Sequence, residues 1–194
     1  MPRIIAGTRK SLLLETPKID GVRPTYDRTK ESLFNIVDSR YPYQKQIVLD
    51  IFSGTGSIGL EFLSRGAEKA VFIDKDISIT KSNVTKCRFE DKTVIIKSDW
   101  QKGLAKLKEE QYRFTHIFLD PPYGSGLYER VIENSDLYDI MDKNAVVIAE
   151  LSEEDTVLKK TSNLVLIDKR KYGICVFAFY VKGNYEDLDL SGKF

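Results

Sequence analysis

The chain has little cysteine and little histidine. Among its 194 residues there are 2 cysteines, Cys87 and Cys175, and 1 histidine, His116. The cysteines are far apart in the sequence, so we expect no disulfide framework and no metal site, and both thiols are predicted to be reduced and buried. His116 lies within an apolar run and is predicted to be a core residue rather than an acid or base.

Long hydrophobic runs and a large net charge are also missing. The longest apolar stretch, residues 174–181, is far shorter than the roughly 20 residues of a membrane span. The first seven residues have no signal-peptide core, which predicts a cytoplasmic location and no membrane partner. The net charge of +1 neither requires nor excludes a nucleic-acid partner. The oligomeric state is left open, with a monomer as the default.

The chain does have enough apolar material for a core. Hydrophobic residues make up 42%, including 10 Tyr and 10 Phe, which argues against a largely disordered chain. After residue 46, short apolar runs alternate with helix patterns. The runs are 47–51, 70–74, 93–97, 115–120 and 145–149, and the helix patterns among them are 57–64, 77–89 and 101–109. Continuous β-branched runs separated by helices predict a doubly wound, Rossmann-like α/β fold with a mostly parallel sheet.

The two ends of the chain differ from this core. Runs 164–167 and 174–181 have no helix pattern between them and predict a C-terminal antiparallel hairpin. At the other end, runs 4–6 and 12–14 flank a polar turn and predict a second hairpin, followed by a helix over about 26–37. The predicted organisation is therefore an extension over 1–45, a core domain over 46–184 and a tail over 185–194.

Four aspartates follow the predicted parallel strands. Asp50, Asp74 and Asp120 lie at the ends of the first, second and fourth predicted strands, and Asp99 lies two residues beyond the third. The carboxyl ends of parallel strands share one edge of a sheet, so we expect these acids to line one cleft. Each of them could instead be a helix cap or a turn residue.

A glycine turn follows the first strand. Positions 54–59 read G-T-G-S-I-G, which matches the dinucleotide fingerprint, and Asp74 follows at about the distance of a ribose-binding acid. Asp50 argues against a dinucleotide, because a carboxylate just before the turn would repel pyrophosphate. An acidic cleft instead suits S-adenosylmethionine, which carries a sulfonium, an ammonium, a ribose diol and an adenine amine.

The candidate cofactor residues surround this turn. Asp74 would bind both ribose hydroxyls and Asp99 the adenine amine, while Trp100 would either stack on adenine or pack in the core. The glycines would let the backbone approach the ligand closely. The remaining candidates are Asp50, Phe52, Gly54, Thr55, Gly56 and Lys75.

The fourth strand leads into the tetrapeptide Asp120-Pro121-Pro122-Tyr123. Two prolines after an apolar strand stop the ladder and stiffen the turn, so a purely structural turn is one interpretation. However, D-P-P-Y at this place, together with an aspartate and a glycine turn after the first strand, resembles methyltransferases that act on exocyclic amino nitrogens of nucleobases.

Further motifs narrow this resemblance to one family. They are R-I-I-A-G at 3–7, R-P-T at 23–25, K-E-S-L-F-N at 30–35, L-D-I-F-S-G-T-G at 49–56 and L-S-R-G-A at 63–67. Together they resemble the RsmD family of 16S ribosomal RNA guanine-N2 methyltransferases, over nearly the whole chain. Thr55 stands where the family more often has serine, and the hydroxyl is kept.

The resemblance implies methyl transfer from S-adenosylmethionine to guanine N2 in 16S rRNA or in a small-subunit assembly particle. Asp120 and the carbonyl of Pro121 would accept the two amine hydrogens, and Tyr123, after Pro122, would stack on the extruded base. Neither Cys87 nor Cys175 is expected to lie beside this turn, which disfavours cysteine-based pyrimidine methylation. By analogy, Arg23, Thr25 and Lys30 would lie over the cofactor and the target base, although Thr25 could simply cap a helix.

The N-terminal 30 residues carry an excess of four positive charges. Arg9 and Lys10, at the tip of the predicted hairpin, could meet RNA phosphates, or the tip could be an ordinary solvated loop; the resemblance favours RNA. The predicted RNA-binding residues are thus Arg9, Lys10, Arg23 and Lys30.

Three other functions stay open on the sequence. The nearest keeps the cofactor and methylates adenine N6 in DNA or RNA. A nicotinamide-dependent oxidoreductase is disfavoured by Asp50 and by D-P-P-Y, and a non-catalytic RNA-binding module would retain the fold without the chemistry.

Overall fold

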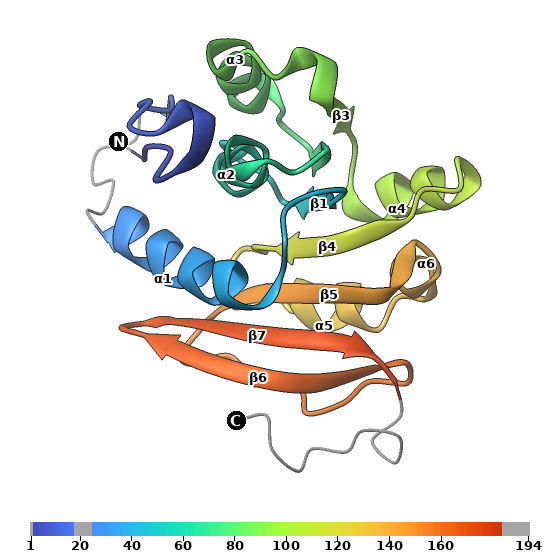
Figure 1. Ribbon diagram of the computed structural model, residues 1–194. Helices are drawn as coiled ribbons and strands as arrows, with labels where there is room; N and C mark the ends of the chain where they lie inside the picture. The colour runs from blue at the N-terminus through green and yellow to red at the C-terminus, as the bar shows by residue number, and fades with distance from the viewer. Residues whose placement is uncertain (1, 18–24, 184–194) are drawn as a thin grey trace. The chain divides into compact units, whose positions relative to one another are not determined.

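The computed structural model describes residues 2–17 and 25–183. The chain divides into two compact units, Met1–Gly103 and Leu104–Phe194. Figure 1 labels the helices and strands of each. The predicted boundaries at 45/46 and 184/185 stay predictions.

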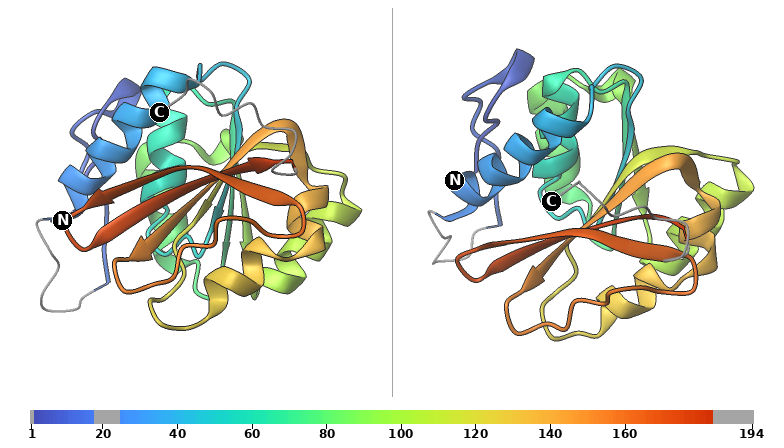
Figure 2. Two further views of the ribbon diagram at one scale, coloured as in Figure 1. Left: turned by 90° about the horizontal axis from the view of Figure 1, so that it is seen from below. Right: turned by 60° about the horizontal axis from the view of Figure 1, so that its bottom comes forward.

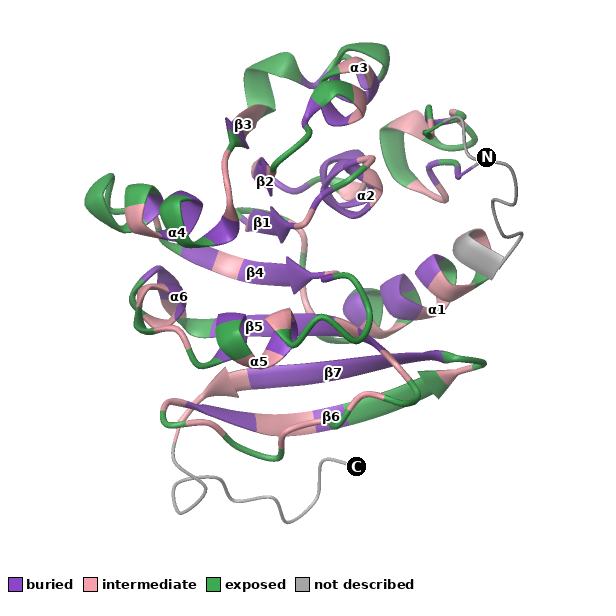
Figure 3. Ribbon diagram, turned by 180° about the vertical axis from the view of Figure 1, so that it is seen from behind, coloured by how far each residue is buried: buried purple, intermediate pink, exposed green. Residues whose placement is uncertain are grey.

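The first unit contains three parallel strands in the order β3-β2-β1. They are β1 (Ile47–Ile51), β2 (Lys69–Asp74) and β3 (Thr93–Lys97), and the helices that follow the first two are α2 (Ser57–Arg65) and α3 (Ser78–Cys87). A short 3-10 helix, η2 (Glu90–Lys92), precedes β3. Strands β1 and β2 are buried over most of their length, as Figure 3 shows in purple. This burial explains why their sequences are continuously apolar rather than alternating.

The N-terminal segment of this unit folds back on itself around a short 3-10 helix. Residues 4–6 and 12–14 do run antiparallel, with Ile4 N–H bonded to the Leu12 carbonyl at 2.9 Å, but only one isolated bridge forms, between Arg3 and Leu13. Between them the chain forms a 3-10 helix, η1 (Gly7–Arg9). The two predicted runs thus pair as an antiparallel hairpin with a single bridge, and the backbone N–H groups of Ile5 and Ala6 bond to Glu61 of α2 rather than across the pair. Helix α1 (Thr25–Arg40) follows and is longer than predicted.

The carboxylate of Glu61 on α2 joins these elements. It is fully buried and accepts hydrogen bonds from the backbone N–H groups of Ile5 at 2.7 Å and Ala6 at 2.9 Å. It also pairs with Lys30 of α1 at 3.4 Å and with Arg65 at 2.8 Å. One buried acid thus holds the N-terminal segment and α1 against α2.

Gly7 allows the segment to approach α2 this closely. Its φ is +79°, and a Cβ at this position would lie 1.9 Å from the Ser64 carbonyl oxygen. No other residue type fits without moving the backbone.

The second unit contains four strands in the order β4-β5-β7-β6. Strand β4 (Phe114–Leu119) is parallel to β5 (Met141–Ser152), which is antiparallel to β7 (Cys175–Lys182), and β7 pairs with β6 (Leu164–Tyr172). The β6–β7 hairpin is the long red ribbon in Figure 2. It confirms the predicted C-terminal hairpin.

Three further helices complete the described elements. Helix α4 (Trp100–Glu109) matches the predicted pattern at 101–109, whereas α5 (Leu127–Ile132) and α6 (Ser135–Asp139) were not predicted. Both are too short for a clear helical period, and α6 depends on the Asn134 side chain, which accepts bonds from the N–H groups of Asp136 and Leu137.

The predicted core residues are buried. His116 is 4% exposed, and burial lowers its pKa to about 4, so the ring is neutral. Cys87 and Cys175 are free and buried, as expected. Within residues 2–17 and 25–183, no helix is both long and apolar enough to cross a membrane.

We predict that Glu61→Gln will lower the free energy of unfolding by about 3–5 kcal/mol, because Lys30 would be left buried beside a neutral group. Urea unfolding followed by circular dichroism measures this loss. The matched control is Glu68→Gln, at an exposed position in the same unit, which should change stability by less than about 0.5 kcal/mol. A loss below about 1 kcal/mol for Glu61→Gln would contradict the role of this carboxylate.

Candidate active site

The turn between β1 and α2 has a left-handed backbone at three positions. Phe52, Gly54 and Gly56 have φ values of +63°, +52° and +73°. At Gly56, a Cβ would come within 3.1 Å of the Thr80 methyl group and 3.3 Å of the Phe72 ring, so this glycine is required for both φ and space. The turn therefore presents backbone groups, rather than side chains, at the carboxyl end of β1.

Asp74, at the end of β2, bonds to this turn. One carboxylate oxygen accepts the Gly54 N–H at 2.8 Å and the other accepts the Asp76 N–H at 3.1 Å. Thr80 of α3 holds the other side of the turn by donating its hydroxyl to the Gly54 carbonyl at 2.8 Å. Asn83 donates to the Thr55 carbonyl at 2.9 Å. The structure thus brings Asp74, Gly54 and Thr55 together, as the fingerprint predicted.

Asp50 lies beneath the turn and is only 2% exposed. Its carboxyl accepts the Gly59 N–H, in the first turns of α2, at 3.0 Å. Burial raises the pKa of Asp50 to about 8; the Gly59 bond opposes this rise and the charge of Asp74 adds to it. A carboxyl that is costly to ionise is stabilised in its charged form by a nearby cation, so the site suits a ligand with positive charge.

Two candidates, Asp99 and Trp100, lie at the start of α4. Asp99 accepts the Lys102 N–H at 3.0 Å, and this bond holds its pKa below the usual range; its carboxylate also lies 3.7 Å from the Lys102 ammonium. It therefore has the capping geometry that the sequence left open. Trp100 is 6% exposed and packs in the core. Lys75, the last candidate here, is exposed next to Asp74.

The D-P-P-Y turn follows β4 in the second unit. Asp120 is half-buried, Pro121 is buried, Pro122 is exposed, and Tyr123 is 48% exposed with its hydroxyl 3.5 Å from a Glu150 carboxylate oxygen. The turn borders a small hollow lined also by Tyr128 and Leu151. An exposed aromatic ring beside a rigid diproline segment offers a flat surface to a planar ligand.

Sequence reasoning missed Glu150 and misjudged Cys175. Glu150 lies on β5, and burial raises its pKa, while hydrogen bonds from Cys175 and Tyr123 oppose the rise. Cys175 is close enough to Asp120 for that charge to act on it, so the expectation that no cysteine lies near this turn is wrong. Burial, chiefly, raises the pKa of this thiol, so it stays protonated and is no nucleophile. The registers of neighbouring strands produce this proximity, because β4 pairs Leu119 with Ala149 of β5 and β5 pairs Ser152 with Cys175.

The predicted RNA contacts have different environments. Lys30 is 5% exposed, and its ammonium donates to the Arg3 carbonyl at 2.6 Å besides pairing with Glu61, so it has a structural role. Burial lowers its pKa. Arg9 is half-buried and Lys10 is exposed. Arg23 and the side chain of Thr25 lie outside the described residues.

Within the two described stretches, no group of three or more His, Cys, Asp or Glu side chains could hold a metal ion. The candidate residues of the first unit offer carboxylates and backbone groups, and those of the second unit offer a carboxylate and an aromatic ring.

Parallel strands, a glycine turn with two acids and a D-P-P-Y turn define the class: an α/β fold of the methyltransferase type. The chain belongs to the family described as "Conserved hypothetical protein 95", whose model matches residues 2–181. This confirms the resemblance seen in the sequence.

Proteins that are similar to this chain over most of its length carry methyltransferase names. The chain is 35% identical to "Ribosomal RNA small subunit methyltransferase D" of Haemophilus influenzae, over 92% of each chain. It is 31% identical to "Putative rRNA methyltransferase YlbH" of Bacillus subtilis, over 93% of this chain and 98% of the relative. Among solved structures, "Putative methyltransferase yhhF" from Escherichia coli matches with a TM-score of 0.74 and 29% identity, covering 93% of this chain and 97% of that one. The predicted fold class is therefore confirmed.

We predict that Asp50 makes the protein less stable as the pH rises. Its pKa is about 8 when folded and near 3.8 when unfolded, so its stabilising contribution is complete below about pH 4 and is lost as the pH rises to about 8. Asp50→Asn removes this titration and keeps an acceptor for Gly59. The difference in Tm between the variant and the wild type should therefore grow in favour of the variant from pH 5 to pH 8.5. A difference independent of pH would contradict the raised pKa.

Proposed function

We propose that this protein is a ribosomal RNA methyltransferase that transfers a methyl group from S-adenosylmethionine to the exocyclic N2 of a guanine in 16S rRNA, in the RNA itself or in a small-subunit assembly particle. The observation that carries the proposal is the rigid turn after β4, where the half-buried Asp120 is followed by two prolines and the exposed Tyr123. The relatives named as rRNA methyltransferases support the choice of RNA. Work on ribosomal RNA also implies a cytoplasmic location.

The first unit supplies residues that fit the methyl donor. The ribose diol of the donor suits the carboxylate of Asp74, which is already held beside the Gly54 N–H. The sulfonium and ammonium groups suit the buried acid Asp50, whose ionised form needs a cation nearby. A nicotinamide dinucleotide would bring pyrophosphate charge toward the same acids, and repulsion disfavours it.

The second unit supplies residues that fit the acceptor base. The amine of guanine is a weak nucleophile, because its lone pair is delocalised into the ring. In the proposal, the Asp120 carboxylate and the Pro121 carbonyl accept its two hydrogens and so orient the nitrogen, while Tyr123 stacks on the base. The N–CH3 bond forms as the S–CH3 bond breaks, the sulfonium becomes a neutral thioether, and the amine loses one proton to Asp120 or to water.

The test is methyl transfer itself. The protein is incubated with S-adenosylmethionine carrying a labelled methyl group and with ribosomal particles lacking their own methylation, and the RNA is digested to nucleosides. We expect label in N2-methylguanosine. Label in N6-methyladenosine would move the function to adenine, and no label with any RNA would contradict the proposal.

We predict that Tyr123→Ala lowers kcat/KM for RNA by roughly 5- to 150-fold, which corresponds to about 1–3 kcal/mol of stacking on one base. Tyr123→Phe is the matched control, because it keeps the ring and removes only the hydroxyl that faces Glu150. Methyl-transfer kinetics at a fixed saturating donor concentration measure both variants. Equal losses in the two variants would show that the hydroxyl, not stacking, carries the effect.

A further inference from the structure

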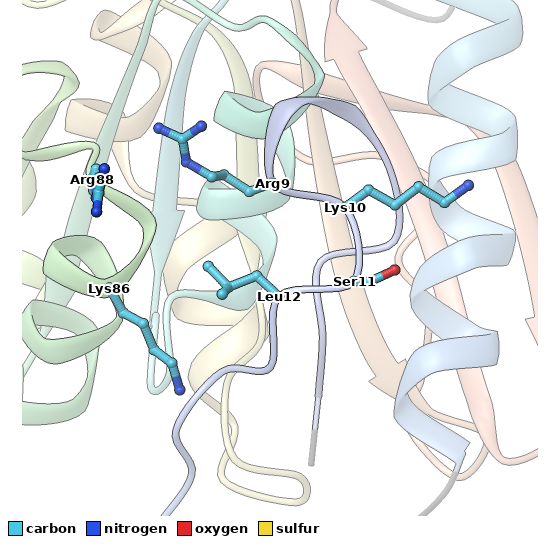
Figure 4. A pocket seen from close by; sticks show the side chains of 6 residues that line it. All are labelled: Arg9, Lys10, Ser11, Leu12, Lys86 and Arg88. Carbon is cyan, nitrogen blue, oxygen red and sulfur yellow. The ribbon is translucent and has the colours of Figure 1, made fainter.

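A pocket lies on the first unit between the N-terminal loop and the C-terminal end of α3 (Figure 4). Its volume is about 560 Å³. The residues that line it are Arg9, Lys10, Ser11, Leu12, Lys86 and Arg88. Four of these six are basic, and none of these lining residues carries a carboxylate. Sequence reasoning singled out only Arg9 and Lys10, because nothing in the sequence brings residues 86–88 next to them.

Three of the basic residues that line the pocket are Arg9 on the loop and Lys86 and Arg88 at the end of α3. In Figure 4, the Arg9 and Leu12 side chains extend from the loop toward α3, whereas those of Lys10 and Ser11 extend away from α3. Lys86 and Arg88 are both exposed at the end of the helix. Among the charges that act on Cys87 at this end, Glu90 is the one acid, and its side chain is also exposed. Positive charge therefore predominates among the side chains that line the pocket.

Arg9 is fixed in place before any ligand arrives. Its Nε donates to the Cys87 carbonyl at 2.6 Å, and its guanidinium lies 5.0 Å from the centre of the Phe89 ring. A guanidinium that is already held loses little side-chain freedom on binding an anion, and its planar fork matches a phosphate group.

A purely structural interpretation accounts for part of this cluster. Arg9 and Lys86 lie at the C-terminal end of α3, where the helix dipole favours cations. Arg88, the C-cap residue of α3, lies at the same end, but the helix dipole does not account for the open pocket between the two segments.

We propose that this pocket binds phosphate groups of the RNA backbone, with Arg9, Lys86 and Arg88 as the main contacts. The inference rests on the proposed function, which makes RNA the partner. An acidic protein is disfavoured, because protein interfaces have a largely apolar and aromatic centre and Leu12 is the single apolar side chain of this lining.

The pocket lies at the opposite end of α3 from the glycine turn. Thr80, near the start of the helix, bonds to Gly54, whereas Cys87, at its end, bonds to Arg9. Seven residues of helix separate these two positions, or about 10 Å along the axis. The contact therefore lies away from the reacting groups and contributes to RNA affinity rather than to the methyl-transfer step.

The experiment compares Lys86→Gln/Arg88→Gln with a matched control on the same stretch, Lys81→Gln/Lys92→Gln, whose side chains are exposed outside the pocket. Binding to protein-free 16S rRNA is measured from 50 to 200 mM salt. We expect the pocket variant to bind about tenfold more weakly and its log–log salt slope to fall by about 1.4–1.8, the value for two lost phosphate contacts. With saturating RNA its kcat should match the wild type, while KM for RNA rises. The control, which removes the same charge, should change the slope by less than half as much.

Two other results would overturn the inference, and a third would separate it from the proposed function. Equal slopes for the pocket variant and the control, with Tm unchanged, would overturn the inference. Weaker binding to assembled particles with unchanged binding to protein-free RNA would also overturn it, in favour of a ribosomal protein partner. If the wild type binds RNA through this pocket but methylates no rRNA, the proposed function fails and the phosphate site remains.

Discussion

The hydrogen bond between the buried Asp50 carboxyl and the Gly59 N–H is the constraint on which the rest of the candidate donor site depends. It ties the end of β1 to the start of α2, and the left-handed turn between them follows from that tie. Burying a carboxyl without a cation costs free energy, as its raised pKa shows. A purely structural turn would not need this acid, since an amide or a hydroxyl could accept the same bond. A positively charged ligand gives its burial a reason.

The residues proposed for the donor and for the acceptor fall in different units. Asp50, Gly54 and Asp74 belong to the first, whereas Asp120 and Tyr123 belong to the second. Each set has its own neighbours: Thr80 and Asn83 hold the glycine turn, and two prolines stiffen the backbone that leads to Tyr123. The chemistry of donor binding and that of base presentation are therefore built from separate local structures.

Much of the fold could be predicted, because the hydrophobic pattern of a short segment largely decides whether it forms a strand or a helix. The runs at 47–51 and 93–97 match their strands, and the glycine turn and Asp74 meet as their spacing indicates. The failures have tertiary causes. Lys30 was predicted to lie over the target base and bind RNA, but it is buried and pairs with Glu61 on a helix distant in sequence. The turn of the N-terminal hairpin is a 3-10 helix, beside which Ile5 and Ala6 bond to the distant Glu61, and Cys175 reaches the region of Asp120 through the registers of β4, β5 and β7.

Calorimetric titration with S-adenosylhomocysteine, the demethylated product, tests the central claim most directly. The account predicts one site per chain in the wild type and at least tenfold weaker binding in Asp74→Asn, which keeps an acceptor for Gly54 but loses the carboxylate proposed for the ribose. The measurement would contradict the account if the wild type took up no S-adenosylhomocysteine, or if it bound a nicotinamide dinucleotide in its place.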